Sequence, residues 1–417
     1  MTATVHVVGA GLAGLAAAVA LSRAGRRVIV HEAGPTAGGR CRSFPDRALG
    51  LTIDNGNHLL LAGNRAALGY LGMIGARERM DGPAEPCFPF VDLATGARWQ
   101  VRPNAGRLGW WIFCPARRVP GTGARDYLRL LRLARITDDR SVAAALPDNV
   151  LFRRLFAPLA IAALNTAPEQ GLARLLGAVV RQTLLAGGAA CRPLLPRVSL
   201  ADALIDPALS ALRARGAALR LGRRIAALEI TAGRVVALRG PNAITRLGAE
   251  DSMVLAVPPW VAADLLPGLA VPDAFEAILN LHFAATADPG PAGFFGLIGG
   301  TAEWVFVKPR HVSVTISAAN RLVDRPAEAL AALVWPEVCR ALRLPAGAAP
   351  PAYRVVKEKR APFAATAAQE RRRPGARVGL ANLALAGDWT ATGLPATIEG
   401  AIRSGFIAAA LLLSPSP

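Results

Sequence analysis

The chain has 417 residues, too many for one ordinary domain and enough for two, each with its own core. Hydrophobic residues make up 53% and charged residues 18%, so the sequence is far from intrinsic disorder and is apolar for a soluble protein. The net charge of +19 comes mostly from arginines scattered along the chain with few aromatic residues among them, which argues against nucleic acid as a partner and favours an anionic membrane surface.

The five cysteines are odd in number, far apart and without a C-x-x-C pair. This spacing predicts a reducing compartment, no disulfide framework and no metal site. No apolar run reaches the roughly 18 residues of a membrane span, and the apolar N-terminal stretch lacks the basic start of a signal peptide. We therefore expect a cytoplasmic protein, or one held at the inner face of the cytoplasmic membrane.

The first thirty residues predict a βαβ unit. Residues 4–8 read as a buried strand, and the glycine-rich turn that follows leads into an alanine-rich helix ending near Gly25. Residues 27–31 read as the second strand. A parallel sheet is therefore expected from the very start of the chain.

The glycines of this turn have the spacing of a dinucleotide-binding fingerprint. The first permits the tight turn, the second lets the backbone approach a pyrophosphate, and the third lets the helix pack on the strand, so that the phosphates meet the helix N-terminus. Glu32 ends the second strand and can accept hydrogen bonds from a ribose diol, which disfavours NADP. The residues predicted to contact the dinucleotide here are Gly9, Gly11, Leu12, Ala13, Gly14 and Glu32.

FAD and NAD share this fingerprint, and the segment after Glu32 helps to distinguish them. Gly38-Gly39-Arg40, with Ser43 three residues later, resembles the glycine-arginine signature of the amine oxidase and phytoene desaturase flavoprotein superfamily. The resemblance implies that this loop follows the pyrophosphate and flavin of FAD, with Arg40 contacting the phosphates.

A segment near the other end of the chain favours FAD as well. A predicted strand at 383–386 ends at Gly387-Asp388, where the carboxylate is placed to accept a ribityl hydroxyl. The turn Pro395-Ala396-Thr397 starts a helix whose positive dipole end can face the flavin N1/O2 edge, where negative charge accumulates on reduction. Residues of the superfamily take these roles, and the resemblance further implies that the backbone at Ile225 pairs with adenine. No cysteine lies within 380–400, so FAD should be bound non-covalently.

The remaining patterns suggest how the chain is divided. Helical patterning between 73 and 195 and strand-like residues at 292–317 suit a substrate domain, whereas the hairpin-rich stretch at 218–239 and the apolar strand at 253–257 return to the cofactor domain. Arg371–Pro374 is expected to be a solvated loop. We predict an α/β fold, a Rossmann-like FAD-binding domain of the glycine-arginine type with an inserted α+β substrate domain. The FAD-binding domain would comprise residues 1–75, 196–260 and 378–417, and the substrate domain residues 76–195 and 261–377.

At a finer level, four segments resemble the hydroxysqualene dehydroxylase family of bacterial hopanoid biosynthesis, also called squalene-associated FAD-dependent desaturases. These segments are Asp54–His58, Pro158–Thr166, Leu195–Ala208 and Gly387–Gly400. The second and third lie outside the cofactor motifs, so FAD binding does not explain them. The sequence departs from the family pattern at Asn57, where glutamine is expected, and at Ala391, where an acid is commoner.

That resemblance implies reductive removal of the hydroxyl group of hydroxysqualene to give squalene. Reduced FAD would deliver a hydride to carbon while the hydroxyl leaves as water. Physically, the step needs an apolar tunnel and one group that protonates the departing oxygen. The candidates for that group are His58, Asp54 and Glu399. The electron donor that reduces FAD is not indicated by the sequence.

An isoprenoid lipid must be taken from a bilayer, which gives the positive charge a purpose. Arg125, Arg129 and Arg132 recur at helical spacing among leucines, and the apolar segment Trp110–Phe113 lies just upstream. Residues 107–135 are therefore predicted to contact a membrane surface, or else to form an ordinary solvated helix face with tryptophan in the core.

Three alternatives stay open. A carotenoid-type desaturase would use the same fold to remove hydride from a phytoene-like substrate. An amine oxidase is less favoured, because no aromatic pair is evident that would flank the flavin. A non-catalytic, FAD-containing scaffold in a lipid-synthesis complex is the alternative from a different class.

Overall fold

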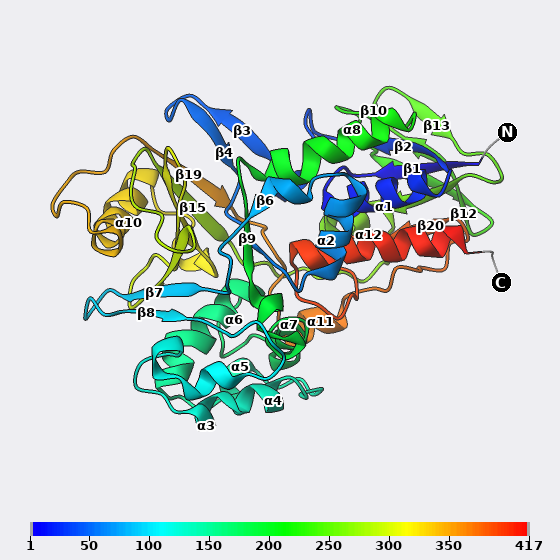
Figure 1. Cartoon of the computed structure of the whole chain (residues 1–417). Coiled ribbons are helices and arrows are strands. Elements are labelled where there is room, and N and C mark those ends of the chain that lie inside the picture. The colour runs from blue at the N-terminus through cyan, green and yellow to red at the C-terminus, as the bar shows by residue number, and fades with distance from the viewer. Residues whose placement is uncertain (1–2, 415–417) are drawn as a thin grey trace.

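The computed structural model describes residues 3–414. A five-stranded parallel sheet lies at one end of the molecule, on the right in Figure 1. Four of its strands are short apolar runs that are largely buried on both faces, as parallel sheets require, and the edge strand β10 (Ala218–Arg220) is largely exposed. In spatial order the five strands are β10, β2 (Arg27–His31), β1 (Thr4–Val8), β14 (Ser252–Leu255) and β20 (Leu383–Leu385).

The predicted βαβ unit is confirmed, with α1 (Leu12–Arg23) connecting β1 to β2. The C-terminal helix α12 (Ile398–Leu413) packs closely along α1, because a Cβ atom at Gly405 would lie 2.2 Å from the carbonyl oxygen of Ala13. The remaining helices of this half are α2 (Arg65–Met73), α8 (Asp206–Ala214) and α9 (Pro259–Leu265). Segments from the start, middle and end of the chain thus build one unit, in keeping with the proposed discontinuous cofactor domain.

A second, seven-stranded mixed sheet lies on the other side of the molecule (Figure 1). The stretch predicted to be strand-like at 292–317 contributes three of its strands. The helix α10 (Ala327–Leu342) packs on one face, against residues such as Leu281 and Val314. In spatial order the strands are β19 (Tyr353–Glu358), β15 (Ile278–Phe283), β18 (Val312–Ile316), β17 (Trp304–Val307), β16 (Phe294–Ile298), β7 (Phe88–Asp92) and β8 (Arg98–Val101).

On the opposite face of that sheet, the part formed by β15 and β18 is polar although it is largely buried. Alternation along each strand directs Asn280 and His282 of β15, and Ser313 and Thr315 of β18, away from α10. Asn57, from the loop after β4, donates hydrogen bonds from Nδ2 to the hydroxyl oxygens of Ser313 (2.7 Å) and Thr315 (3.1 Å). Polar side chains therefore connect this sheet to the loop at 54–58.

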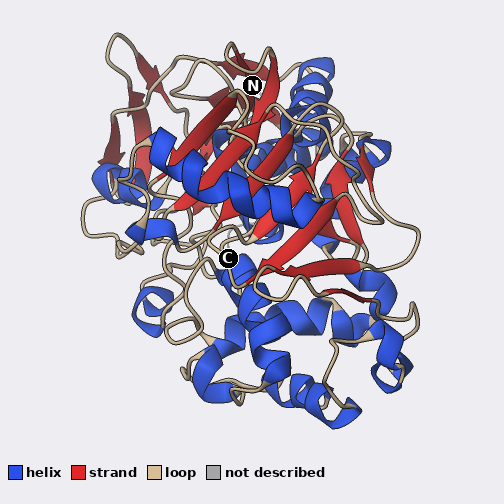
Figure 2. Cartoon of the chain, turned by 90° about the vertical axis from the view of Figure 1, so that its left-hand side faces the viewer, coloured by secondary structure: helices blue, strands red, loops and turns tan. Residues whose placement is uncertain are grey.

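Most helices of the middle region gather in a lobe at one end of the molecule (Figure 2). These are α3 (Ala124–Tyr127), α4 (Arg129–Leu133), α5 (Val142–Ala145), α6 (Ala157–Leu164) and α7 (Ala173–Gln182), with α11 (Ala367–Arg371) from a later segment. Small sheets complete the fold, namely β3 (Ser43–Asp46) with β4 (Leu51–Asp54), β5 (Leu60–Leu61) with β9 (Pro193–Pro196) and β6 (Met80–Asp81), and β11 (Ala227–Thr231) with β12 (Arg234–Arg239) and β13 (Ile244–Arg246).

The expectation that Arg371–Pro374 forms a solvated loop is wrong. Arg371 ends α11, and the side chain of Arg373 is fully buried. Its guanidinium donates hydrogen bonds to the carboxylate of Glu370 and to backbone carbonyls of the segment 388–394. The composition of this arginine run suggests a solvated segment. The carbonyls of the segment 388–394 nevertheless keep Arg373 buried, and no pattern in the sequence indicates that contact.

All five histidines have a lowered pKa, and burial is the first cause at each. They are His6, His31, His58, His282 and His311. At His31, for example, burial and the neighbouring imidazole of His6, 3.1 Å away, lower the pKa to about 4. The folded protein therefore keeps these imidazoles neutral at a pH where an unfolded chain would protonate them.

Acid should therefore destabilise the fold in a predictable window. Between the unfolded histidine pKa of 6.5 and the folded value of about 4, the unfolded chain binds more protons, so stability falls as the pH drops through this range. Glu303, whose pKa burial raises to about 7, acts in the opposite direction, but it is one group against five. We expect the urea midpoint to decrease steadily from pH 7.5 to pH 5. An unchanged midpoint over this range would contradict the neutral buried imidazoles.

Candidate functional site

The turn between β1 and α1 has the geometry of a phosphate cradle. A Cβ atom at Gly9 would lie 2.3 Å from the carbonyl oxygen of Ala256, and one at Gly14 would lie 2.0 Å from the carbonyl oxygen of Gly9. Nothing lies within 4 Å of the corresponding position at Gly11, and no side chain caps α1. The N-terminus of α1, with Leu12 and Ala13 in its first turn, therefore faces open space, where an anion would be stabilised.

Glu32 is held rigidly at the end of β2. Its carboxylate accepts hydrogen bonds from the backbone N–H groups of Ala10 (2.8 Å) and Gly34 (2.7 Å). The backbone N–H of Arg223 donates to the Glu32 carbonyl (2.7 Å), which brings the segment leading to Ile225 beside this carboxylate. The predicted ribose and adenine contacts thus lie next to each other, just beyond the phosphate cradle.

The glycine-arginine loop lies directly against the phosphate cradle. The backbone N–H of Gly38 donates to the carbonyl of Ala10 (2.8 Å), and both Gly38 and Gly39 have the positive φ angles that favour glycine. Arg40 then forms an ion pair with Asp388 (Nη2 to Oδ2, 2.6 Å), so the two predicted cofactor residues, 348 positions apart, are in contact. Arg40 also donates to the carbonyl of Ala361 (2.8 Å).

The predicted turn before the C-terminal helix completes this arrangement. Gly387 follows β20 and its backbone N–H donates to the hydroxyl of Ser404 on α12 (2.8 Å). Thr397 caps α12 by accepting from the Gly400 N–H (3.1 Å), and Pro395 and Ala396 precede it. The N-terminus of α12 is thereby fixed relative to the end of β20 and to Asp388.

These residues form one continuous site that fits FAD. The site contains its parts in the order in which a dinucleotide would need them. These are a carboxylate for ribose, an uncapped helix N-terminus for pyrophosphate, an arginine–aspartate pair and a second helix N-terminus. The open space above Gly11 is the strongest sign, since a Cβ atom there would point into it. The contacts above bring the predicted cofactor-binding residues into one region, and their binding of FAD stays a prediction.

A cavity of about 180 Å³ lies beside the glycine-arginine loop, and Asp54, His58 and Lys308 line it together with apolar side chains such as Leu195 and Phe306. Asp54 is 1% exposed and accepts from Lys308 Nζ (2.7 Å). Burial alone would raise the pKa of Asp54, but the Lys308 ammonium, together with hydrogen bonds from Ser43 and Leu200, outweighs burial and lowers it. Asp54 is therefore ionised.

His58 lines the same cavity and is within range of the positive charges of Arg40 and Lys308. Burial, followed by the charges of Arg40 and Lys308, lowers its pKa to about 4. The neutral imidazole is therefore the resting form at neutral pH. The backbone N–H of Asn55 donates to the carbonyl of Arg42 (3.0 Å), so the segment that carries Asp54 and His58 lies beside the end of the glycine-arginine loop.

The third catalytic candidate from the sequence, Glu399, forms its contacts away from the cavity. Its carboxylate accepts from the backbone N–H groups of Ala66 (3.1 Å) and Ala67 (2.9 Å), at the N-terminus of α2, and it pairs with Arg403 (3.5 Å). It does not line the cavity. Glu399 thus fastens α12 to α2.

Sequence reasoning missed Lys308 and Arg373 as parts of the site. Lysine is rare in this arginine-rich chain, and that scarcity is the one signal that could have drawn attention to Lys308. For Arg373 the sequence offers no such signal, because its partners are backbone carbonyls.

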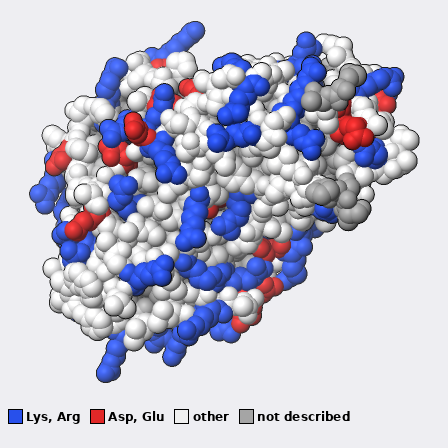
Figure 3. Space-filling model, turned by 45° about the vertical axis from the view of Figure 1, so that its right-hand side comes forward, with Lys and Arg blue, Asp and Glu red and all other residues white. Residues whose placement is uncertain are grey.

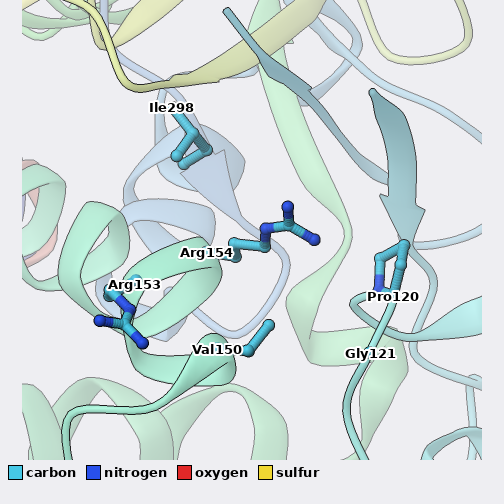
Figure 4. A pocket seen from close by; sticks show the side chains of 6 residues that line it. All are labelled: Pro120, Gly121, Val150, Arg153, Arg154 and Ile298. Carbon is cyan, nitrogen blue, oxygen red and sulfur yellow. The ribbon is translucent and has the colours of Figure 1, made fainter. Parts of the chain in front are cut away.

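A larger hollow of about 440 Å³ lies at the edge of the helical lobe (Figure 4). Arg154 extends into it between Ile298 and Pro120, while Arg153 points away. The Arg154 guanidinium is already paired with Asp92 (3.3 Å) and lies over the ring of Trp99 (5.3 Å to the ring centroid). None of the predicted cofactor residues lines this hollow.

Membrane-spanning helices and metal-binding clusters are both absent from the described residues. Across the described range, residues 3–414, no helix is long and apolar enough to cross a membrane. Within the same part of the chain, no cluster of three or more His, Cys, Asp or Glu side chains is arranged to hold a metal ion.

Known proteins share both the sequence and the fold. The chain matches the family described as flavin containing amine oxidoreductase over residues 12–288 and 308–413. It is 49% identical to a hydroxysqualene dehydroxylase of Rhodopseudomonas palustris and 48% identical to one of Sinorhizobium fredii, over 99% of both chains in each case. A solved cyclohexylamine oxidase of Brevibacterium oxydans has a TM-score of 0.68 at 17% identity, covering 99% of each chain. That last likeness concerns the fold, and it confirms the predicted α/β class.

Proposed function

The chain belongs to the family of flavin containing amine oxidoreductases, and from this premise we propose that it converts hydroxysqualene into squalene and water with FAD as its cofactor. The observation that carries this proposal is near-half identity to hydroxysqualene dehydroxylases along the entire chain. The identity includes the substrate-domain half, which FAD binding alone would not constrain.

The chemistry divides between cofactor and protein. When bound, reduced FAD supplies a hydride to a substrate carbon. The protein must hold the carbon that bears the hydroxyl, exclude water from a centre that gains positive character, and supply one proton to the leaving oxygen. Apolar side chains including Leu195, Val198 and Phe306 line the cavity and suit the first two tasks.

Of the three catalytic candidates, the geometry favours two as substrate-site residues. Asp54 and His58 both line the cavity, and we propose that they bind or orient the hydroxyl group. Neither holds a readily released proton at neutral pH, because Asp54 is ionised and His58 is neutral. Glu399 is proposed to act structurally, through its contacts with α2.

The reaction direction separates this function from that of a carotenoid-type desaturase. Hydroxysqualene should yield squalene only with enzyme whose flavin has been reduced anaerobically, as judged by mass analysis of extracted lipid. Oxidised enzyme should leave a phytoene-like polyene unchanged. Conjugated products from oxidised enzyme, with no squalene from reduced enzyme, would replace the proposal with the desaturase function.

We further propose that residues 107–135 contact an anionic membrane from which the lipid substrate is taken. Leu108 and Phe113 are 83% and 71% exposed, and Trp110 is half exposed, whereas Trp111 is buried and anchors the segment through an edge-to-face contact with Tyr127. Exposed apolar side chains next to α3 and α4 also include Leu128 and Leu131. Basic side chains project from the lower part of the molecule, where these helices lie (Figure 3). Exposed arginines of the segment are Arg107, Arg125, Arg129, Arg132 and Arg135.

Replacing the exposed aromatic residues should weaken this membrane contact. A Trp110→Ser/Phe113→Ser variant should bind vesicles containing anionic lipid at least about tenfold more weakly, because each ring contributes roughly 1.5–3 kcal/mol when it leaves water. Vesicle flotation measures the change. Ile244→Ser is the matched control, because Ile244 is 49% exposed on a distant hairpin and should not alter flotation. Equal flotation of all three proteins, or none by the wild type, would contradict the membrane contact.

A further inference from the structure

Removal of a hydroxyl group as water requires a proton donor, and the sequence candidates do not supply one. Asp54 carries no proton, His58 is neutral, and Glu399 lies outside the cavity. Arg197 also borders the cavity, but a guanidinium does not give up its proton in proteins. The remaining titratable side chain that lines the cavity is Lys308.

Lys308 is placed as a proton donor would need to be. It follows β17 in the turn to β18, and its backbone N–H donates to the carbonyl of His311 (3.0 Å), which fixes the turn. Its side chain is 18% exposed, and its Nζ lies 2.7 Å from Asp54 Oδ2. An ammonium group has three N–H donors, so one bond to Asp54 leaves others for a substrate oxygen in the cavity.

Apart from Asp54 and Arg197, the side chains that line the cavity around this ammonium are apolar or uncharged. Phe306, Val307 and Pro309 line the cavity on either side of Lys308. The titratable groups near it are Asp54 at the end of β4, His58 from the loop after β4, His282 from β15 and His311 from the segment between β17 and β18. Burial and the Lys308 charge contribute to lowering the pKa of His282 to about 3 and of His311 to about 4, so neither competes as the acid.

On the basis of the proposed function, we infer that Lys308 protonates the departing hydroxyl oxygen and that Asp54 is the positioning residue for its ammonium. The carbon–oxygen bond breaks, the oxygen takes a proton from Lys308 Nζ and leaves as water, and the carbon receives the hydride that reduced flavin supplies. The substrate carbon is reduced and the flavin is oxidised. Lys308 is left as a neutral amine beside the Asp54 carboxylate, which favours its reprotonation from water.

The test is single-turnover conversion of hydroxysqualene by anaerobically reduced enzyme carrying Lys308→Ala. Squalene formation should slow roughly 100-fold to 10,000-fold, the range that a positioned acid contributes. Added alkylamines that fit the vacated space should restore part of the rate, and the restored rate should depend on the pKa of the amine. A purely structural role of Lys308 would not produce that dependence.

Two further variants show whether a slow rate in Lys308→Ala comes from the lost proton donor or from a disturbed fold. Lys308→Met/Asp54→Asn removes both charges, so no unpaired carboxylate remains buried, and it should be as slow as Lys308→Ala while keeping the FAD content and the unfolding temperature of the wild type. Lys359→Met, at an exposed lysine, is the control and should keep the wild-type rate. A charge-free pair that makes squalene at the wild-type rate would overturn the inference while leaving the proposed function intact. Failure of the wild type itself to make squalene would overturn both.

Discussion

A Gly14→Ala variant is expected to lose FAD and to unfold more readily than the wild type. The added Cβ atom would lie 2.0 Å from the carbonyl oxygen of Gly9 and 3.2 Å from the Cβ atom of Ala256, and a methyl group has no alternative rotamer that relieves the clash. Forcing α1 away from β1 should cost roughly 3 kcal/mol or more, and displacing the helix N-terminus should weaken FAD binding by at least about 100-fold. Flavin content after purification and thermal unfolding measure the two effects.

Gly11→Ala is the matched control for this variant. No atom lies within 4 Å of its added Cβ atom, so the apoprotein should unfold at nearly the wild-type temperature. The methyl group would nevertheless point into the space proposed for the pyrophosphate, so FAD affinity should still fall. A Gly11→Ala protein with wild-type FAD affinity would mean that the cofactor does not lie over this turn.

Arg373→Met should produce the second large effect. Arg373 is fully buried, pairs with Glu370 (2.8 Å), and donates to the carbonyls of Leu394 (2.8 Å) and Asp388 (3.1 Å). Removing one partner of a buried ion pair typically costs about 3–5 kcal/mol, because the other charge and the carbonyls lose their donor. Since the segment 388–394 carries Asp388 and leads to α12, FAD should also dissociate more readily.

The adjacent Arg371 provides the comparison. Its side chain is 65% exposed and pairs with Asp139 at the surface (2.7 Å). Exposed ion pairs contribute about 0–1 kcal/mol, so Arg371→Met should leave the urea midpoint and the flavin content nearly unchanged. Similar losses in the two variants would indicate that Arg373 is not the residue that braces the segment 388–394.

The local parts of the fold could be predicted from the sequence. The βαβ unit depends on short-range periodicity and on glycines at fixed spacing, and both strands and the helix occur where these patterns place them. The helix after Thr397 likewise begins at a capping residue that the sequence displays. Motifs whose geometry is set by residues close in the sequence could thus be predicted.

Contacts between segments that are far apart in the sequence could not be predicted. Lys308 forms an ion pair with Asp54, which lies 254 positions away in the sequence, and neither the residue types nor their spacing predicts this pair. The role of Glu399 was likewise hidden, because the residue begins a helix that faces the proposed flavin edge, yet its carboxylate turns to the N-terminus of α2. Arg373 shows the same limit, because burial of a charge depends on carbonyls that only the folded chain brings together.

The central claim is that this flavoenzyme reductively dehydroxylates hydroxysqualene, and one anaerobic measurement tests it most directly. The bound flavin is photoreduced, one equivalent of hydroxysqualene is added in detergent, and the return of oxidised-flavin absorbance is followed while the lipid is extracted for mass analysis. We predict reoxidation with about one squalene formed per flavin, the stoichiometry of a single hydride transfer. Flavin that stays reduced, with hydroxysqualene recovered intact, would contradict the claim.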